Sequence, residues 1–301
     1  MILLDAELLA LAFVFGANNI GVIRSAFQQV SGRAAIGYVA ASALAFAAGF
    51  LTEGYKVEST LTRSLTTLGT DASLVALAAM LILLSSFTMV KFPASVSNLA
   101  LGSMIGVSFA SRTYVNFDVL VAILVAWLLA PVTAALLALL LHRIFLRAVR
   151  DRSLESAATS VRMVGTVAVI FASYTLGANN LGILLGFSGS LASTLGVMVA
   201  ALAGGILFSR LVAWLLGWKM ATLSPTAYFS ALVGASLTLW LYTQLGIPTS
   251  LTQAIVGAMV VLSYTRKPSI VNPKVVFEVL GSWPVLLLAA MALAYLAESL
   301  L

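Results

Sequence analysis

The tetrapeptide Gly16-Ala17-Asn18-Asn19 and its copy Gly177-Ala178-Asn179-Asn180 decide how this chain folds. Strongly apolar sequence leads into both, from Leu8 in the first case and from Val167 in the second. A buried Asn amide costs free energy unless hydrogen bonds satisfy it. Because the pair recurs at a matching place in each half, we expect the two copies to build one two-sided polar site.

Composition places this site in a membrane. The 301 residues are 61% hydrophobic and 9% charged, with a mean hydropathy of +1.10. Apolar stretches of about 18 residues or more recur along the whole chain, and each one is a candidate membrane span. We therefore predict an all-α polytopic protein of the cell membrane, with the lipid bilayer as its surroundings. The net charge of +6 comes without a basic run rich in aromatics, so no nucleic-acid partner is expected.

A second motif divides the chain into two repeats. Residues 93–97 (Pro-Ala-Ser-Val-Ser) match residues 248–252 (Pro-Thr-Ser-Leu-Thr) at an offset of 155 residues, and the Asn-Asn motif recurs at an offset of 161. Each half has about five apolar segments, some of them broken. Since five is odd, the second half enters the membrane the opposite way up, as in many secondary transporters. We predict two inverted repeats at residues 1–147 and 161–301, joined by a basic cytoplasmic linker at residues 148–160.

The distribution of positive charge predicts the orientation. If the N-terminus is outside and ten segments cross, Lys56, Arg63 and Arg112 lie outside and the other 13 of the 16 basic residues lie inside. Those inside are Arg24, Arg33, Lys91, Arg143, Arg147, Arg150, Arg152, Arg162, Arg210, Lys219, Arg266, Lys267 and Lys274. The positive-inside rule then favours both termini outside. The motif segments are alternatively re-entrant hairpins, which alters the number of crossings but not the repeat.

Two local predictions complete this organisation. Gly16 is expected to break the first apolar segment, which runs from about Leu3 to Val30. His142 begins the arginine-rich linker, and a lone His without a partner is expected to be a solvated loop residue.

The proline motifs indicate an anion site. Pro93 and Pro248 each remove a helix donor and leave carbonyl groups unpaired, so the breaks should line a polar cavity. The helix that starts after each break presents free N–H groups and a positive dipole end, which favour an anion. We predict a substrate-binding set of Asn19, Ser95, Val96, Ser97, Asn180, Ser250, Leu251 and Thr252. In the alternative interpretation these hydroxyl groups only cap helix starts.

Amide side chains supply the candidate cation ligands. Asn offers two donors and a carbonyl acceptor, so it binds Na⁺ through oxygen or an anion through nitrogen. The predicted cation-binding set is Asn18, Asn19, Asn98, Asn179, Asn180 and Gln253. Alternatively the Asn residues staple helix breaks or cross-link helices. No cysteine occurs and the acidic residues lie at segment ends or in loops, so we predict no catalytic residue, no resident metal and no cofactor.

The two repeated motifs resemble those of the PiT inorganic phosphate transporters. That family carries Gly-Ala-Asn-Asp and Pro-x-Ser-Thr-Thr-His-like motifs in inverted halves. Residues 48–50, 57–60 and 257–258 also resemble the family's continuation. The resemblance implies a tetrahedral oxyanion held near the midplane, coupling to Na⁺ or H⁺, and a homodimer.

This chain departs from the family pattern at the motif ends. Asn19 and Asn180 replace the family's Asp, Val22 and Ile183 replace an Asn, and Asn98 and Gln253 replace a His. A carboxylate accepts the proton that phosphate carries near neutral pH, whereas sulfate carries no such proton and is repelled by a carboxylate. We predict a cation-coupled symporter of phosphate that works by alternating access. The alternatives are a sulfate permease of the same family, a passive anion channel and, with least support, a membrane enzyme.

Overall fold

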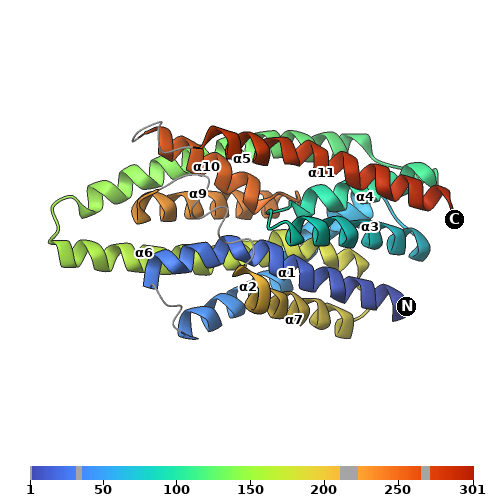
Figure 1. Ribbon diagram of the computed structural model, residues 1–301, viewed down its shortest axis with the longest axis horizontal. Coiled ribbons are helices and arrows are strands. Elements are labelled where there is room, and N and C mark those ends of the chain that lie inside the picture. The colour runs from blue at the N-terminus through green and yellow to red at the C-terminus, as the bar shows by residue number, and fades with distance from the viewer. Residues whose placement is uncertain (1, 32–35, 211–222, 266–271) are drawn as a thin grey trace.

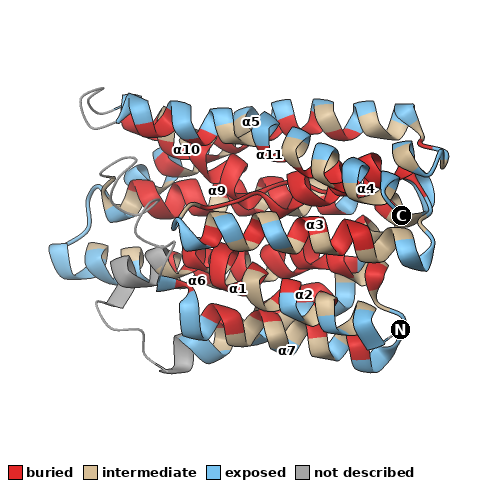
Figure 2. Cartoon of the chain, turned by 45° about the vertical axis from the view of Figure 1, so that its right-hand side comes forward, coloured by how far each residue is buried: buried red, intermediate tan, exposed pale blue. Residues whose placement is uncertain are grey.

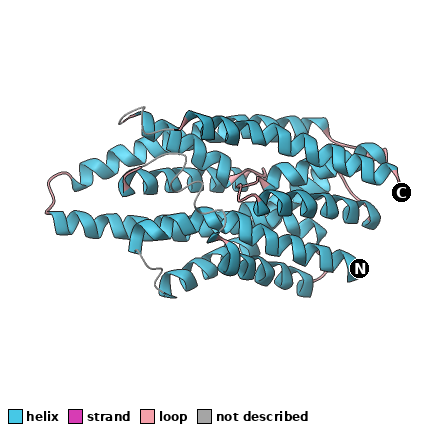
Figure 3. Cartoon of the chain, in the orientation of Figure 1, coloured by secondary structure: helices cyan, strands magenta, loops and turns pink. Residues whose placement is uncertain are grey.

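The computed structural model describes residues 2–31, 36–210, 223–265 and 272–301. Arg33, Lys219, Arg266 and Lys267, which entered the charge count, lie outside these ranges. Every regular element in the described ranges is a helix (Figure 3), which confirms the all-α prediction. Six described helical segments are long and apolar enough to cross a membrane, which confirms a multi-pass membrane protein.

The helices form one elongated bundle with its long members along a common axis (Figure 1). The first half consists of α1 (Ile2–Ser31), α2 (Ile36–Ser59), η1 (Thr60–Leu65), α3 (Thr70–Met89), α4 (Val96–Ala110) and α5 (Phe117–Val149). The second half consists of α6 (Leu154–Thr175), η2 (Leu176–Leu181), η3 (Gly182–Phe187), α7 (Leu191–Phe208), α9 (Pro225–Gln244), α10 (Leu251–Tyr264) and α11 (Pro273–Ser299). Here η1 and η2 are π-helical and η3 is a 3₁₀-helix.

The two proline motifs lie at the tips of re-entrant hairpins. Helices α3 and α4 both lie in the half of the bundle that holds the two chain termini, whereas α9 and α10 both lie in the opposite half (Figure 1). With 15 and 14 residues, α4 and α10 are about 22 and 21 Å long, too short for a hydrocarbon core of about 30 Å. The structure therefore has the re-entrant alternative rather than ten full crossings, and Lys91 lies at a hairpin tip.

Two sequence predictions about the helices need correction. Helix α1 runs without a break through Gly16, because this glycine lets α1 pack directly against the backbone carbonyl of Ala201 in α7. His142 is not a solvated loop residue: it is buried in α5, with Nδ1 3.4 Å from the hydroxyl oxygen of Ser230. The segment predicted as a basic linker, residues 148–160, consists of the end of α5, the connection at residues 150–153 and the start of α6, and its role as a cytoplasmic linker stays a prediction.

Close glycine contacts show that the two halves exchange partners. A side chain on Gly16 would meet Ala201 of α7, and one on Gly177 would meet Phe46 of α2, so the first helix of each half packs on the second helix of the other. The hairpins do the same: Gly102 of α4 lies against Leu287 of α11, and Gly257 of α10 lies against Pro131 of α5. These contacts involve equivalent glycines of the two halves, while the bounds of the two repeats and their opposite orientation stay predictions. Both termini lie at one end of the bundle (Figure 1), and which face is outside also stays a prediction.

Buried residues concentrate in the interior of the bundle, and exposed residues lie mainly on the outer faces of its helices and at its ends (Figure 2). Large buried rings such as Phe15, Phe46 and Tyr228 occupy the core. On α5 the exposed residues include Val121, Val125 and Leu128. An apolar outer face around a core with buried polar groups is the pattern expected of a protein that is surrounded by lipid.

Candidate functional site

The two hairpin tips have the same local structure. Helix α3 is followed by Lys91 with φ +61°, and α9 is followed by Gly246 with φ +70°, so both tips turn through a left-handed residue. After each turn a serine begins the next helix: Ser95 Oγ accepts a hydrogen bond from the Asn98 backbone N–H at 3.3 Å, and Ser250 Oγ accepts one from Gln253 at 3.4 Å. Ser95 and Ser250 are therefore helix caps in this structure, as the alternative interpretation expected.

The first Asn of the first pair holds one hairpin tip in place. Asn18 is fully buried, and its Nδ2 donates to Thr88 Oγ1 at 2.9 Å and to the Phe92 carbonyl at 3.0 Å. Its Oδ1 accepts from the Ala94 backbone N–H at 2.9 Å. These bonds satisfy backbone groups on both sides of Pro93 that lipid cannot satisfy.

The second half repeats this arrangement bond for bond. Asn179 Nδ2 donates to Thr243 Oγ1 at 2.9 Å and to the Ile247 carbonyl at 3.1 Å, and Asn179 Oδ1 accepts from the Thr249 N–H at 2.7 Å. Each partner lies 155 residues after its counterpart in the first half. Asn18 and Asn179 thus act as hairpin staples, with both amide hydrogens and the oxygen in use. Their predicted cation binding is not tested by these contacts, although each oxygen has at most one lone pair left for an ion.

The second Asn of each pair behaves differently in the two halves. Asn180 Nδ2 donates to Ser97 Oγ at 3.2 Å and to the Thr249 carbonyl at 2.6 Å, so it joins the hairpins of both halves. Asn19 Nδ2 instead donates to the Phe15 carbonyl of its own helix at 3.3 Å. The Asn180 motif lies on the π-helix η2, whereas Asn19 lies on the regular helix α1.

Asn98 and Gln253 meet where the two helix starts approach each other. These residues occupy equivalent places in the repeats, and Gln253 Nε2 donates to Asn98 Oδ1 at 3.3 Å. Asn98 Oδ1 also accepts from Ser95 Oγ at 2.7 Å, and Asn98 Nδ2 donates to the Trp283 carbonyl at 2.8 Å. Ser97 Oγ donates to the Thr249 carbonyl at 3.0 Å, so the two motifs touch directly. The structure therefore brings the two proline motifs together at one buried place.

Two acceptor oxygens at this place have no partner among the described residues. Asn180 Oδ1 and Gln253 Oε1 are both buried and accept no hydrogen bond from another described group. A buried polar atom without a partner costs about 1–3 kcal/mol, so each calls for an explanation such as an ion or water.

Sequence reasoning missed four residues that support the site. Thr88 and Thr243 receive the staple bonds, and each lies five residues before the motif proline, a signal that comparing the two repeats would have found. Trp127 Nε1 donates to the Pro248 carbonyl at 2.7 Å, which satisfies a group exposed by the helix break. Trp283 contributes only its carbonyl, for which the sequence holds no signal.

The groups gathered at the two helix starts are uncharged, so any attraction for an anion comes from the dipoles of N–H and O–H groups rather than from a net charge. Val96 and Leu251 are the first residues of α4 and α10, where backbone N–H groups lack helical partners. Buried hydroxyl groups of Ser97 and Thr252 stand in the same first turns. In the described ranges no three His, Cys, Asp or Glu side chains gather into a possible metal site. The site is thus neutral, rich in donors and enclosed.

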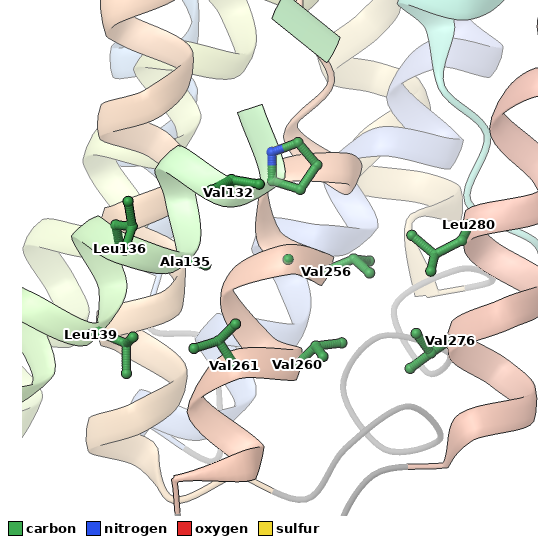
Figure 4. Close-up of a pocket in the computed structure, with 11 residues that line it drawn as sticks. Val132, Ala135, Leu136, Leu139, Val256, Val260, Val261, Val276 and Leu280 are labelled. Atoms are coloured by element: carbon green, nitrogen blue, oxygen red, sulfur yellow. The ribbon is translucent and has the colours of Figure 1, made fainter. Parts of the chain in front are cut away.

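A pocket of about 320 Å³ between α5, α10 and α11 is not this site (Figure 4). Its walls are apolar side chains such as Val132, Leu136, Val256 and Leu280. An oxyanion there would lose its hydration without gaining a hydrogen bond, so the pocket cannot hold one.

Comparison with known proteins agrees with this geometry. The family model described as "Phosphate transporter family" matches residues 8–138 and 146–294. A relative from Methanocaldococcus jannaschii that is named a phosphate permease is 27% identical over 236 residues, which cover 78% of this chain and 77% of the relative. A Rhizobium meliloti protein named as a low-affinity inorganic phosphate transporter is 36% identical over 106 residues, 34% of this chain and 31% of that protein.

A solved structure has the same fold. A sodium-dependent phosphate transporter superposes with a TM-score of 0.84 at 15% identity, over 99% of this chain and 98% of that one. At this identity the likeness concerns the fold alone, whereas the family model covers nearly the whole sequence. The chain therefore belongs to the phosphate transporter family, a family of membrane transporters rather than enzymes.

Proposed function

We propose that this protein is a secondary active symporter that carries inorganic phosphate together with a cation, by alternating access around the place where the two hairpins meet. One observation carries the proposal. Two helix starts from opposite repeats, each with buried hydroxyl groups, converge on one buried neutral site. Such paired helix ends at a broken-helix interface bind the substrate in transporters built from repeats.

The phosphate would be held by the predicted substrate-binding residues. Thr252 offers a hydroxyl hydrogen, and Ser97 would offer its own once it leaves the Thr249 carbonyl to which it now donates. Val96 and Leu251 offer backbone N–H groups at the two positive helix ends. Ser250 caps its helix as an acceptor, which leaves its hydroxyl hydrogen for the oxyanion. Ser95 donates its hydroxyl hydrogen to Asn98 Oδ1, so it would have to turn away from Asn98 to bind the oxyanion directly. Asn19 would contribute its second amide N–H, and Asn180 would contribute one when it releases Ser97 or the Thr249 carbonyl.

The coupling cation would be Na⁺, held by amide oxygens. Asn180 Oδ1 and Gln253 Oε1 are buried acceptors without a described partner, and both come from the second repeat. No carboxylate occurs between Ala72 and Ser111 or between residues 226 and 265, so a proton has no carboxylate acceptor in the hairpins. The sodium dependence of the similar solved transporter supports Na⁺ over H⁺. Asn18, Asn19, Asn98 and Asn179 remain candidate ligands.

Alternating access is supported by the unequal behaviour of Asn19 and Asn180. Asn180 bridges the two hairpins by donating to Ser97 and to the Thr249 carbonyl. The equivalent partners of Asn19 would be Thr252 and the Ala94 carbonyl, but Asn19 donates to its own helix instead. Two repeats in unequal conformations are what one access state of a symmetric transporter requires. Exchange of the two conformations would open the site to the other side.

Uptake of labelled anions into proteoliposomes tests the proposal. We expect saturable phosphate uptake that is driven by an inward Na⁺ gradient and abolished when an ionophore collapses it. Ser97→Ala should reduce uptake strongly, while Ser236→Ala should not, because Ser236 is equally buried but bonds only to the Leu232 carbonyl of its own helix. Flux that follows the anion gradient alone and shows no saturation would instead indicate a passive channel and overturn the proposal.

Sulfate is the second candidate, and a specific observation favours it. Asn19 and Asn180 are neutral amides, so the described site offers no carboxylate to accept the proton of monohydrogen phosphate. Labelled sulfate is therefore measured in the same vesicles, with each anion competing against the other. Uptake of sulfate with phosphate as a weak competitor would replace the phosphate assignment.

Two further measurements test the proposed assembly and orientation. The mass of the protein in detergent tests the homodimer. Labelling of a tag at each terminus from either side of the membrane tests whether both termini lie outside.

A further inference from the structure

Lys91 is the feature of the hairpins that the proposed site does not explain. It is the only charged residue between Ala72 and Ser111, and residues 225–265 of the second hairpin contain none. It lies at the tip of the α3–α4 hairpin, just before the non-helical residues that lead to Ser95. A single positive charge among about 80 residues of hairpin, inside a membrane protein, is a functional-site hypothesis by default.

The backbone at Lys91 is one that glycine adopts more readily. Lys91 has φ +61°, and Gly246, which lies 155 residues later at the other tip, has φ +70°. The turns are otherwise alike: the Lys91 N–H donates to the Thr88 carbonyl at 3.0 Å, and the Gly246 N–H donates to the Thr243 carbonyl at 2.9 Å. Glycine serves the turn in one repeat without strain, so the turn itself does not require a lysine.

The Lys91 side chain is exposed, together with its neighbours Met89 (81%) and Val90 (72%). An ammonium group and a non-helical backbone at membrane depth are tolerated only where they face protein or water, not lipid. Because of its charge, we expect the Lys91 side chain to face a water-filled approach rather than lipid. The four residue steps from Lys91 to Ser95 span at most about 14 Å, so the charge lies close enough to act on an anion at the start of α4.

We propose that Lys91 is an electrostatic selectivity residue that draws divalent oxyanions to the site and stabilises them at its entrance. The hydroxyl and amide groups of the site carry no net charge, so Lys91 supplies the charge that discriminates a dianion from a monoanion. A charge about 10 Å from a dianion in water changes its affinity by roughly 4-fold. This inference rests on the proposed transport of an oxyanion.

The absence of cysteine from the chain permits a direct test of this role. Lys91→Cys is reconstituted and treated with membrane-impermeant methanethiosulfonate reagents that carry either a trimethylammonium or a sulfonate group. We expect both reagents to modify the cysteine from one side of the membrane, and inorganic phosphate to slow the reaction. The cationic adduct should restore the KM of the unsubstituted protein, and the anionic adduct should raise KM roughly 16-fold above that, because the charge changes by two. Both adducts are attached to the same Cys variant, so a difference in KM between them cannot come from backbone strain or from misfolding.

Arg112 provides the matched control. It is also exposed, cationic and left-handed (φ +54°), but it follows the far end of α4. Adducts on Arg112→Cys should therefore leave KM unchanged. Lys91→Gly should raise KM about 4-fold while leaving thermal stability equal or higher, since glycine relieves the turn.

Two results would overturn the role of Lys91: failure of the impermeant reagents to reach residue 91, or equal KM values for the two adducts. Each of these is observed in a protein that still takes up the anion. Failure of the proposed function looks different, because the unsubstituted protein would then show no saturable uptake of phosphate or sulfate.

Discussion

Replacing Asn18 with alanine tests whether the hairpin tip depends on its staple. The substitution removes three buried hydrogen bonds, to Thr88 Oγ1, the Phe92 carbonyl and the Ala94 N–H. The Thr88 hydroxyl keeps its bond to the Leu84 carbonyl, so the two backbone groups are the ones left without a partner. Each buried group without a partner costs about 1–3 kcal/mol, which gives an expected loss of roughly 2–6 kcal/mol in the free energy of unfolding.

The repeat makes this prediction sharper. Asn179 makes the same three bonds in the second half, but the Ile247 carbonyl also accepts a hydrogen bond from Thr249 Oγ1 at 3.2 Å. Asn179→Ala therefore leaves one backbone group without a partner and should cost about 1–3 kcal/mol. Reversible unfolding of the purified protein in mixed micelles, followed by circular dichroism against denaturant, measures both losses. Ser236→Ala serves as the control, because it removes a buried hydroxyl that bonds only within its own helix. A loss below about 0.5 kcal/mol for either staple variant, or a larger loss for Asn179→Ala than for Asn18→Ala, would refute the reasoning.

Three further predictions use other parts of the site. Gly16→Ala should destabilise the protein by about 1–3 kcal/mol, because the new methyl group collides with the Ala201 carbonyl. Gly69→Ala places its methyl group in open space and should not destabilise the protein, so thermal unfolding of the two variants tests the prediction. The Asn19→Asp, Asn180→Asp double variant should move the uptake ratio toward phosphate or strengthen its Na⁺ dependence, and an unchanged ratio and dependence in the vesicle assay would show that these positions do not set anion choice. The Ser95→Ala, Ser250→Ala double variant should lose about 1 kcal/mol per cap and most of its uptake, whereas full uptake would mean that these hydroxyl groups are only caps.

The repeated motifs predicted which segments meet between the two halves. The structure joins Asn180 to Ser97 and Gln253 to Asn98 by direct hydrogen bonds, while the binding roles of these residues stay predictions. The sequence could not predict that the two Asn residues of each pair form different hydrogen bonds. Asn18 and Asn19 are chemically identical neighbours, and only the direction that each takes from α1 makes one a staple and leaves the other on its own helix.

Two errors in the fold have physical causes. Gly16 suggested a break because glycine disfavours helices in water, but between lipid-embedded helices a small residue permits close packing instead. His142 was assigned to a loop from its arginine-rich surroundings. Its spacing from Ala134 and Ala138, each four residues apart along α5, places all three on one buried face, and this periodicity was the better guide.

Hydropathy could not separate the re-entrant hairpins from full crossings. Crossing and re-entrant helices are equally apolar, since both must satisfy the same lipid or protein surroundings. Helix length was the available signal: the apolar stretches that follow Pro93 and Pro248 form helices of only 15 and 14 residues.

The exchange of partners between the halves has a consequence for biosynthesis. Gly16 packs against Ala201, and Gly49 of α2 packs against Tyr174 of α6. The first half therefore emerges from the ribosome before the residues on which it packs have been synthesised. Insertion into the bilayer and assembly of the core are then separate events in time, and the second cannot finish until the last helices are made. Stability is therefore a property of the whole chain, and a half expressed alone has no partner surface except that of another half.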